Sequence, residues 1–428
     1  MTRIGNSAVI GLQWGNEGKG PLLDFMTISS DVIVRYRGCS SSGRTINVGR
    51  NNIKVRYVPR GIAQSGKKCL ISGGAFIDME KMAAEISALK EAGALNAEFV
   101  ISPHCHVVLD YHKKLDVLDH RMFGMRSGTA IDELGLCAAC ADKCRGLGIR
   151  AEDLLSRNAL YEKIEQNLAI KNEYLMKVYG ERGLDAEALY DKCLKHGEAL
   201  KPYIGDAAGI TELSMDKGVA VLFEGSGGAM NDIDGGIYPY VSPCSSALSS
   251  VMAGTGVTPK APLWAIGVIK SYSTRSDEGP FLTEETGAVA PFIRSRGCEI
   301  SDITGKARRV GWLDIPALRY ALLENPVDAV AVTKLDVLTG VDEIRICMSY
   351  MLDGKEKKCF DTGIFYAEYA APVYRTMSGW KEDISGCCSF KSLPLQAQAY
   401  IKFIEDSIAK PVVWVGSGKH WADAIIRC

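Results

Sequence analysis

Residues 11–20 read GLQWGNEGKG, a glycine-rich stretch that lies between two apolar segments. The apolar run Ser7–Leu12 leads into it and has the composition of a short buried strand, while Leu22–Met26 behind it can begin a helix. Backbone N–H groups in such a turn converge on an anion, and the N-terminus of the following helix attracts negative charge. The stretch therefore predicts a strand–loop–helix unit that holds the phosphates of a nucleotide.

Apolar, β-branched segments alternate with helical patterns along the rest of the chain. This alternation predicts an α/β fold with a large central, mostly parallel β-sheet and surrounding helices. We expect a single domain over residues 1–428, with a mainly helical subdomain inserted at 79–205. Strands are expected at Ser7–Leu12, Asp31–Tyr36, Ile53–Val58, Cys69–Ile71, Val219–Phe223, Trp264–Ser271, Ala329–Thr333, Arg345–Tyr350 and Val412–Gly416, and helices at Met79–Ala92, Arg150–Gly180, Asp185–His196, Ile315–Leu323 and Leu395–Ile408.

The overall composition argues against several classes of partner. The formal net charge is -1 and 24% of the residues are charged, so no basic excess points to nucleic acid or to a membrane surface. No apolar run reaches the roughly 18–20 residues that span a bilayer, and the N-terminus lacks a signal-peptide pattern. We expect a cytoplasmic protein that binds small molecules.

Three of the fourteen cysteines form a cluster at Cys137, Cys140 and Cys144. Three thiolates at this spacing can hold a metal ion or an iron–sulfur cluster. The same spacing places them on one face of a helix, where reduced cysteines of a cytoplasmic chain pack as small hydrophobic residues. We favour buried packing.

Two further segments suit a guanine nucleotide. In Thr333–Asp336, the Asp336 carboxylate can accept hydrogen bonds from a guanine base while the stem of Lys334 stacks on the ring; a surface ion pair is the alternative. In the segment 38–45, which reads GCSSSGRT, Arg44 can grip a phosphate with two donors, although a plain polar loop has the same composition.

Two loops are candidates for the substrate side. The acidic, glycine-rich turns at 224–228 and 232–236 can form an active-site wall or a simple connection. The basic loop Lys306–Arg309 can bind a carboxylate-bearing substrate or form a solvated surface run.

Taken together, these segments resemble the adenylosuccinate synthetase family along nearly the whole chain. In that family, GTP phosphorylates the 6-oxygen of inosine monophosphate (IMP), and the amine of aspartate then displaces phosphate. The resemblance implies a P-loop-related α/β fold, Mg²⁺, aspartate as partner substrate and a homodimer. The motifs that carry it are GLQWGNEGKG at 11–20, VRYRG at 34–38, LDYHKKLD at 109–116, FEGSGG at 223–228, DIDGGIYPYV at 232–241, KSYSTRSDEGPF at 270–281, TGKARRVGWLD at 304–314, TKLDVL at 333–338 and VGSGKHW at 415–421.

The resemblance assigns GTP and Mg²⁺ binding to residues of four motifs. Asn16 and Gly43 would hold the metal ion. The GTP-binding residues would be Gly15, Glu17, Gly18, Lys19, Gly20, Gly43, Arg44, Thr45, Lys334, Asp336, Ser417 and Gly418.

The catalytic positions differ from the family pattern. Asn16 stands where the family has its base aspartate, and an amide cannot take up a proton at neutral pH. Arg44 stands where the family has its acid histidine, and it can stabilise a transferring phosphoryl group but cannot shuttle protons. The substrate-binding residues carried over are Ser41, Thr129, Arg145, Gly227, Ser246, Thr304, Lys306 and Arg308.

These substitutions favour a diverged enzyme. We expect a GTP-dependent carbon–nitrogen ligase that activates an oxygen of a substrate other than IMP and adds an amine such as aspartate. A genuine adenylosuccinate synthetase of purine biosynthesis is the first alternative. A non-catalytic GTP-binding paralogue is the second.

Overall fold

The computed structural model describes residues 5–38, 43–48, 51–123, 134–258, 262–276, 278–301, 305–363 and 369–427. Within these ranges, nine strands form one sheet in the order β19-β18-β14-β10-β1-β9-β2-β5-β7. The sheet is mostly parallel, which confirms the predicted α/β class. The chain groups into two compact units, the first made of Met1–Asn6, Ser30–Gly225 and Ser250–Pro262, the second of Ser7–Ser29, Ser226–Ser249 and Leu263–Cys428.

In the second unit, four neighbouring strands are parallel and almost wholly buried, as expected for strands covered on both faces. Because parallel strands end at the same edge, the loops that follow them gather there. These strands are β1 (Ser7–Gly11), β10 (Trp264–Lys270), β14 (Ala329–Thr333) and β18 (Val412–Gly416), with β19 (Ala424–Ile426) antiparallel at the edge. The helices of this unit are α1 (Gly20–Ser29), α9 (Val289–Arg296), α10 (Ile315–Glu324) and α12 (Leu395–Ile408), whereas α8 (Ser250–Thr255) belongs to the first unit.

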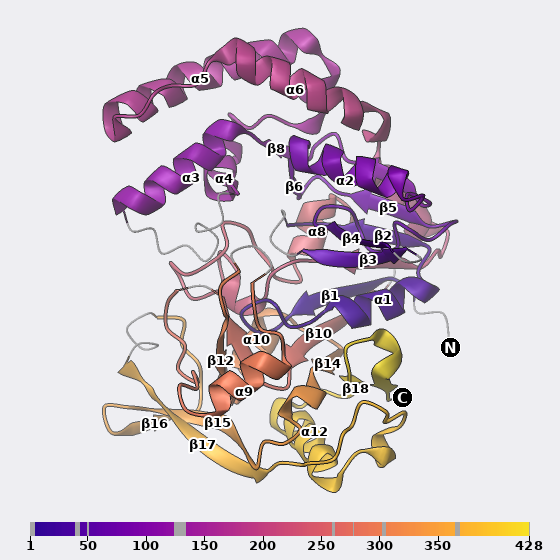
Figure 1. Ribbon diagram of the computed structural model, residues 1–428, viewed down its shortest axis with the longest axis vertical. Helices are drawn as coiled ribbons and strands as arrows, with labels where there is room; N and C mark the ends of the chain where they lie inside the picture. Colours follow the sequence, from indigo (N-terminus) through magenta and orange to yellow (C-terminus); the bar gives the residue numbers. More distant parts are fainter. Residues whose placement is uncertain are drawn as a thin grey trace. The chain divides into compact units, whose positions relative to one another are not determined.

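The first unit combines parallel strands with a helical region. The helices α5 and α6 run side by side (Figure 1), and α6 also packs on α2. Its elements are β2 (Val32–Arg35), β5 (Lys68–Ile71), β7 (Glu98–Ile101), β9 (Val221–Glu224), α2 (Met79–Glu91), α3 (Asp110–Phe123), α4 (Leu136–Arg145), α5 (Arg157–Tyr179), α6 (Ala186–Leu200) and α7 (Ala207–Asp216).

A buried polar network fixes the helices of the first unit. His112 Nε2 lies 3.0 Å from the Asp142 carboxylate, and Lys171 Nζ donates to the same carboxylate at 2.5 Å. These contacts join α3, α4 and α5. All three side chains are buried, so removing Asp142 or Lys171 would leave an uncompensated charge inside the unit.

Smaller sheets complete both units. The first unit contains the hairpin β3 (Arg44–Val48) and β4 (Asn51–Val55) and the pair β6 (Phe76–Asp78) and β8 (His106–Val108). The second contains β11 (Ser273–Arg275) with β12 (Arg309–Gly311), and β13 (Leu313–Asp314), β15 (Glu343–Leu352), β16 (Lys355–Lys357) and β17 (Ala371–Ser378) in one sheet.

Three sequence predictions need correction. The helix expected at Arg150–Gly180 is broken, because Ser156 caps α5 by accepting a hydrogen bond from the N–H of Ala159 at 3.4 Å, and a separate 3₁₀ turn, η2 (Ala151–Leu155), precedes it. The strand expected at Ile53–Val58 is β4, which lies earlier in the chain, at Asn51–Val55, where it pairs with β3. The segment 38–45, expected as a loop, enters strand β3 at Arg44.

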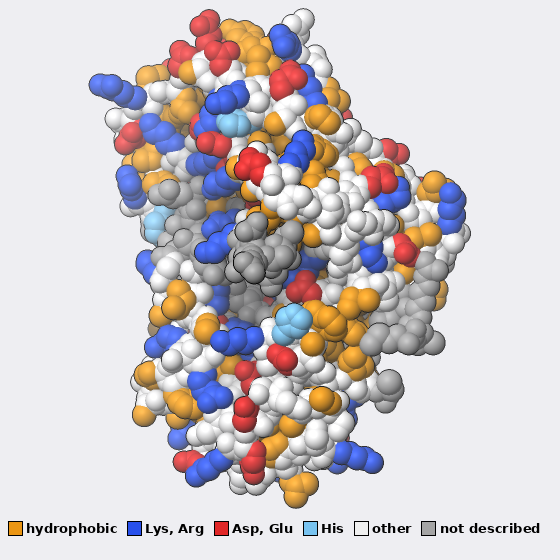
Figure 2. All heavy atoms as spheres, turned by 45° about the vertical axis from the view of Figure 1, so that its right-hand side comes forward, with side chains coloured by type: hydrophobic (Ala, Val, Ile, Leu, Met, Phe, Trp, Pro, Cys, Tyr) orange, Lys and Arg blue, Asp and Glu red, His pale blue; other side chains and the backbone are white. Residues whose placement is uncertain are grey.

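The surface carries both signs of charge. On the face in Figure 2, Lys and Arg side chains are interspersed with Asp and Glu side chains, as the formal net charge of -1 leads one to expect. Within the described ranges, every helix is too short or too polar to cross a membrane.

Candidate functional site

The loop after β1 forms a nest of N–H groups around a carboxylate. The Glu17 side chain is fully buried, and its Oε1 accepts hydrogen bonds from the backbone N–H of Gln13 at 3.2 Å and of Gly15 at 2.9 Å. Gly15 and Gly18 make the turn possible with φ of 76° and 73°. The loop therefore gathers N–H donors around the carboxylate of Glu17, and phosphate binding at this loop stays a prediction.

Lys19 places a positive charge at the same nest. Its ammonium donates to Glu17 Oε2 at 2.5 Å and to the carbonyl oxygen of Gly227 at 2.7 Å. The helix α1 begins directly afterwards, at Gly20, so the positive end of its dipole lies beside Lys19. Charge and dipole together favour a phosphate at this place.

Two glycines of the turn at 227–228 have no room for a side chain. A Cβ at Gly228 would lie 2.3 Å from Glu17 Oε1. Gly227 has φ of 88°, and a Cβ there would lie 3.0 Å from the Cβ of Ser246. The glutamine of the family pattern would therefore be strained at residue 227.

Asn16 lies at the outer side of the loop. It is exposed, has φ of 58°, and donates through Nδ2 to Ser276 Oγ at 3.1 Å. Because Nδ2 is used in this contact, the amide oxygen of Asn16 remains as the acceptor of the side chain. The side chain can therefore position a donor or ligate a cation, but it cannot remove a proton.

Lys334 and Asp336 follow β14 in an unusual local conformation. Lys334 has φ of 56° and precedes the 3₁₀ helix η5 (Leu335–Leu338). Asp336 Oδ1 is buried and has no hydrogen-bond partner among the described residues. Burial raises the pKa of Asp336 above its ordinary value, while the nearby Lys334 opposes that shift. An acceptor left open in this way fits a ligand that presents N–H groups.

Three of the predicted segments meet at the edge where β1, β14 and β18 end (Figure 1). A Cβ at Gly18 would lie 3.2 Å from Thr333 Oγ1 and 3.9 Å from Lys334 Cε. A Cβ at Gly416 would lie 3.5 Å from the backbone N of Lys334, directly before the predicted turn at Ser417 and Gly418. The structure thus brings the phosphate loop, the lysine and the C-terminal turn together.

The C-terminal turn is closed by Asp423. Ser417 is buried and its Oγ donates to the carbonyl oxygen of Asp423. A Cβ at Gly418 would lie 2.6 Å from Asp423 Oδ2, which accepts from the N–H of His420 at 2.9 Å. Asp423 therefore holds the turn in place through both its backbone and its side chain.

Asp232 holds the second acidic turn against Ser246. Its carboxylate accepts from the N–H groups of Asp234 and Gly235, both at 3.0 Å, and from those of Ser246 and Ala247. Although burial opposes ionisation, these N–H groups and Ser245 hold the pKa of Asp232 below its ordinary value. Asp232 is therefore a structural anion that fixes the loop carrying Ser246.

The basic loop, Lys306–Arg309, contacts Glu299 and the residue after it. Ile300 and Ala307 form an antiparallel bridge, and Arg308 Nη1 donates to Glu299 Oε2 at 3.1 Å. Lys306 is exposed. Thr304 lies outside the described residues. Arg308 is therefore paired with a buried carboxylate, and its assignment to substrate binding stays a prediction.

The remaining predicted residues belong to the first unit or lie outside the described residues. Gly43 precedes β3, and Arg44 and Thr45 begin that strand. Arg145 is exposed at the end of α4. Ser41 and Thr129 lie outside the described residues.

The cysteine cluster lies on α4. Cys137 and Cys140 are partly buried and Cys144 is exposed, so the prediction of buried packing is wrong for Cys144, which follows the helix onto its solvent side. The described part of the chain contains no group of three or more His, Cys, Asp or Glu side chains placed to hold a metal ion.

Sequence reasoning missed Glu299, the partner of Lys334. Its carboxylate is buried and accepts from Lys334 Nζ at 2.8 Å and from Lys270 Nζ at 2.7 Å. No spacing rule could have found it, because its partners come from separate loops and become neighbours only in the folded chain.

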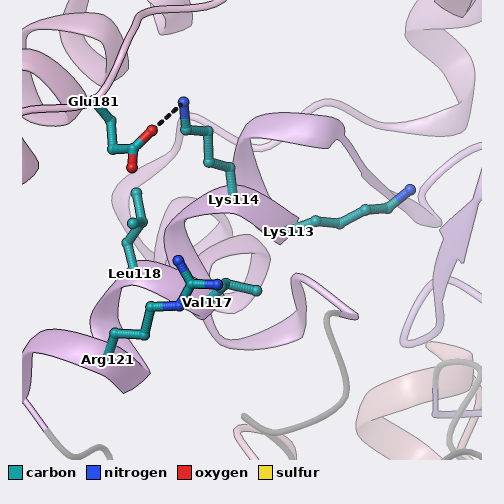
Figure 3. A pocket seen from close by; sticks show the side chains of 6 residues that line it. All are labelled: Lys113, Lys114, Val117, Leu118, Arg121 and Glu181. Atoms are coloured by element: carbon teal, nitrogen blue, oxygen red, sulfur yellow. Dashed lines mark ion pairs between the residues drawn. The ribbon is translucent and has the colours of Figure 1, made fainter.

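A pocket of about 310 Å³ lies elsewhere, on α3 (Figure 3). Lys114 forms an ion pair with Glu181 at 3.2 Å across its upper side, and Lys113 points away from it toward Asp78. Arg121, Val117 and Leu118 complete its wall. It contains none of the predicted residues.

The whole chain matches one known family. Residues 8–425 match the family model described as adenylosuccinate synthetase. The chain belongs to the adenylosuccinate synthetase family. The adenylosuccinate synthetase of Pelobacter propionicus is 37% identical over 99% of both chains. That of Nitratidesulfovibrio vulgaris is 38% identical over 99% of this chain and 100% of its own.

Solved structures agree with this assignment. The fully ligated adenylosuccinate synthetase from Plasmodium falciparum has a TM-score of 0.90 and 31% identity, covering 99% of this chain and 100% of its own. The cyanophage S-2L succinoaminodeoxyadenylate synthetase (PurZ), bound to dGMP and dATP, has a TM-score of 0.60 and 17% identity, covering 99% and 96%. The second likeness is one of fold alone.

The family predicted from the motifs is therefore confirmed. Adenylosuccinate synthetases are GTP-dependent carbon–nitrogen ligases of purine biosynthesis, so the expected enzyme class holds at the level of the family. The expectation of a substrate other than IMP gains no support, because the full-length relatives at 36–38% identity are named adenylosuccinate synthetase. The first alternative is the better supported one.

Proposed function

We propose that this protein joins aspartate to IMP at the expense of GTP, forming adenylosuccinate. GTP binding is supported by Asp336 Oδ1, a buried acceptor beside Lys334 that has no hydrogen-bond partner among the described residues. A guanine base offers N1–H and an amino group, and a buried carboxylate without a partner is stabilised by accepting from them. Adenine offers no such pair of donors on that edge.

The phosphates of GTP fit the loop at 13–19. Lys19 supplies a cation at this loop, and helix α1, which begins at Gly20, places the positive end of its dipole beside it. Mg²⁺ usually takes only one or two protein ligands beside phosphate oxygens and water. The amide oxygen of Asn16 fits that role, and the ion would neutralise charge on the transferring phosphoryl group.

The proposed reaction proceeds in two balanced steps. In the first step the γ-phosphoryl group of GTP moves to the 6-oxygen of IMP while N1 loses its proton to solvent, which leaves GDP. In the second step the aspartate amine attacks C6, the C6–O bond breaks, phosphate departs with the former 6-oxygen, and the amine nitrogen releases a proton to solvent. Asn16 cannot remove the purine N1 proton, so the first step lacks a carboxylate base. We therefore expect a slow enzyme.

The aspartate substrate is assigned to the basic loop. The resemblance assigns Lys306 and Arg308 of this loop to the substrate, and carboxylates pair well with arginine. Arg145 and Arg44 remain proposed phosphate contacts of the first unit. The homodimer implied by the resemblance is likewise part of the proposal.

The test measures adenylosuccinate formation and phosphate release with GTP, Mg²⁺, aspartate and IMP. The proposal expects equal amounts of adenylosuccinate and phosphate, and less of both when ATP replaces GTP. A panel of other purine monophosphates runs in parallel. Turnover with one of these but not with IMP would show a ligase of changed substrate. GTP binding without any turnover would show a non-catalytic paralogue.

A further inference from the structure

Glu299 lies between the two ligand-binding parts of the second unit. It follows α9, and within the described chain its buried carboxylate contacts side chains from three other segments. Oε1 accepts from Lys270 Nζ at 2.7 Å, from Lys334 Nζ at 2.8 Å and from Tyr272 Oη at 2.6 Å. Oε2 accepts from Arg308 Nη1 at 3.1 Å.

The two oxygens of this carboxylate serve different sites. Lys334 belongs to the segment assigned to guanine, and its ammonium is held by Glu299 and by the carbonyl oxygen of Gly297 at 2.6 Å. These two contacts fix the end of the Lys334 side chain. Arg308 belongs to the loop assigned to the aspartate carboxylates, and its backbone N–H also donates to the Glu299 carbonyl oxygen at 2.9 Å.

The charges of this cluster do not balance. Among the described ion pairs, one carboxylate faces the cations Lys270, Lys334 and Arg308. Although burial favours the neutral acid, these cations hold the pKa of Glu299 well below its ordinary value. Burial and the neighbouring cations lower the pKa of Lys270 to about 7. The cluster therefore favours any added negative charge.

We propose that Glu299 is a positioning residue that couples the binding of a guanine nucleotide to the binding of the amino-acid carboxylate. This inference rests on the proposed function and identifies how its two binding sites communicate. When a ligand carboxylate pairs with Arg308, the attraction between Arg308 and Glu299 weakens. The Glu299 carboxylate then holds Lys334 more firmly. Coupling of this kind is reciprocal, so a guanine nucleotide strengthens carboxylate binding by the same factor.

A second feature makes Arg308 able to take part. Its Nε is buried and has no hydrogen-bond partner within the described ranges, although Nη1 is occupied by Glu299. A carboxylate that approaches this edge can therefore be bound without first breaking the contact to Glu299. The two anions then share one guanidinium, which has five N–H donors.

The test measures the dissociation constant of GDP with and without saturating aspartate, in the presence of IMP and Mg²⁺. The wild-type protein is expected to bind GDP about 5- to 50-fold more tightly when aspartate is present, within the usual range of coupling between sites. Glu299→Gln is expected to reduce this factor to about 1–2, because the amide keeps the shape but loses the charge. The reverse measurement, aspartate affinity with and without GDP, must give the same factors.

Two further variants separate positioning from structure. Glu284→Gln is the matched control, because Glu284 pairs with the neighbouring Arg309 through Nε at 2.9 Å and, among the hydrogen bonds and ion pairs of the described residues, joins neither Lys334 nor Arg308. It should keep the wild-type factor. Glu299→Asp keeps the charge but cannot reach both partners, so each ligand should still bind while the factor falls, and this variant serves if Glu299→Gln does not fold.

Each outcome decides between distinct claims. An unchanged factor in the folded Glu299 variants, an equal loss in Glu284→Gln, or a wild-type factor of 1 would overturn the coupling role of Glu299 and leave the proposed function standing. Failure of the wild-type protein to bind GDP or aspartate at all would instead overturn the proposed function.

Discussion

The Lys19 ammonium donates to the backbone carbonyl oxygen of Gly227 at 2.7 Å, so a glycine of one loop positions the cation of another. That carbonyl is presented by a backbone with φ of 88°, which favours glycine. Ser246 leaves little room there for a Cβ, at 3.0 Å. The position of Lys19 therefore depends on the absence of a side chain at residue 227.

Gly227→Ala is expected to lower GTP turnover by about tenfold, the effect of about 1.4 kcal/mol at one charged hydrogen bond. Gly218→Ala is the control, because Gly218 also has a positive φ, of 66°, but a Cβ there would meet nothing within 4 Å. Both variants should lose melting temperature, while only Gly227→Ala should lose turnover. Equal turnover in the two variants would contradict the role given to this carbonyl.

Asp336→Asn should weaken GTP binding by about 10- to 100-fold, because a charged acceptor of two N–H groups is worth about 1.5–3 kcal/mol. The new amide donor matches the 2-oxygen of xanthine, so XTP should bind the variant better than it binds the wild type. Competition against a fluorescent GDP analogue measures both affinities. Asp342→Asn, at an exposed ion pair with Lys381, is the control. Unaltered GTP affinity in Asp336→Asn would rule out guanine recognition by this carboxylate.

Asn16→Asp should raise the rate of adenylosuccinate formation by about 100-fold, the lower end of what a positioned general base contributes. The variant supplies a carboxylate at the place where the proposed chemistry lacks one, without changing the size of the side chain. Asn16→Ala should give no gain. The comparison uses initial rates at saturating GTP, IMP and aspartate. A rate no higher than that of the wild type would show that a missing base does not limit this enzyme.

Asp314→Asn should stabilise the protein, and more so at higher pH. Asp314 is buried at the start of α10, where it accepts from the N–H of Ala317 at 3.0 Å and from Tyr350 Oη at 2.6 Å. Burial raises its pKa from the ordinary 3.8 to about 6. The folded state thus binds the proton more tightly than the unfolded state, so the cost of ionisation is absent below pH 3.8, grows between 3.8 and 6, and is complete above 6.

The difference between these two pKa values corresponds to roughly 3 kcal/mol of stability, and asparagine keeps the cap without the charge. The melting temperature of Asp314→Asn should therefore exceed that of the wild type by several degrees at pH 8 and by little or nothing at pH 4. A lower melting temperature than the wild type at pH 8 would contradict this explanation.

Much of the fold could be predicted because its strands are continuous apolar runs. The predicted bounds of β14, β18 and α12 coincide with those of the structure, since each segment carries one unbroken pattern. The hairpin of β3 and β4 could not be predicted, because Arg44–Val48 is polar and gains its strand conformation from its partner. The break at Ser156 was missed because a cap depends on local geometry rather than on periodicity.

Residues of the candidate site could be named from the sequence where they belong to one short motif. They were missed where the contact joins residues that are far apart in the chain. Lys19, Lys334 and Asp336 could be named from short segments, because each follows a buried strand whose carboxyl end lies at the ligand edge. Glu299 and the crowding between Gly227 and Ser246 depend on residues far apart in the chain. Such relationships appear only when separate loops are folded against one another.

The most direct test of the proposed function follows the 6-oxygen of the purine. IMP labelled with ¹⁸O at position 6 is incubated with the protein, GTP, Mg²⁺ and aspartate, and the released phosphate is analysed by mass spectrometry. Phosphoryl activation of that oxygen predicts one ¹⁸O atom in each phosphate released together with one adenylosuccinate. Unlabelled phosphate, or phosphate release without adenylosuccinate, would contradict it.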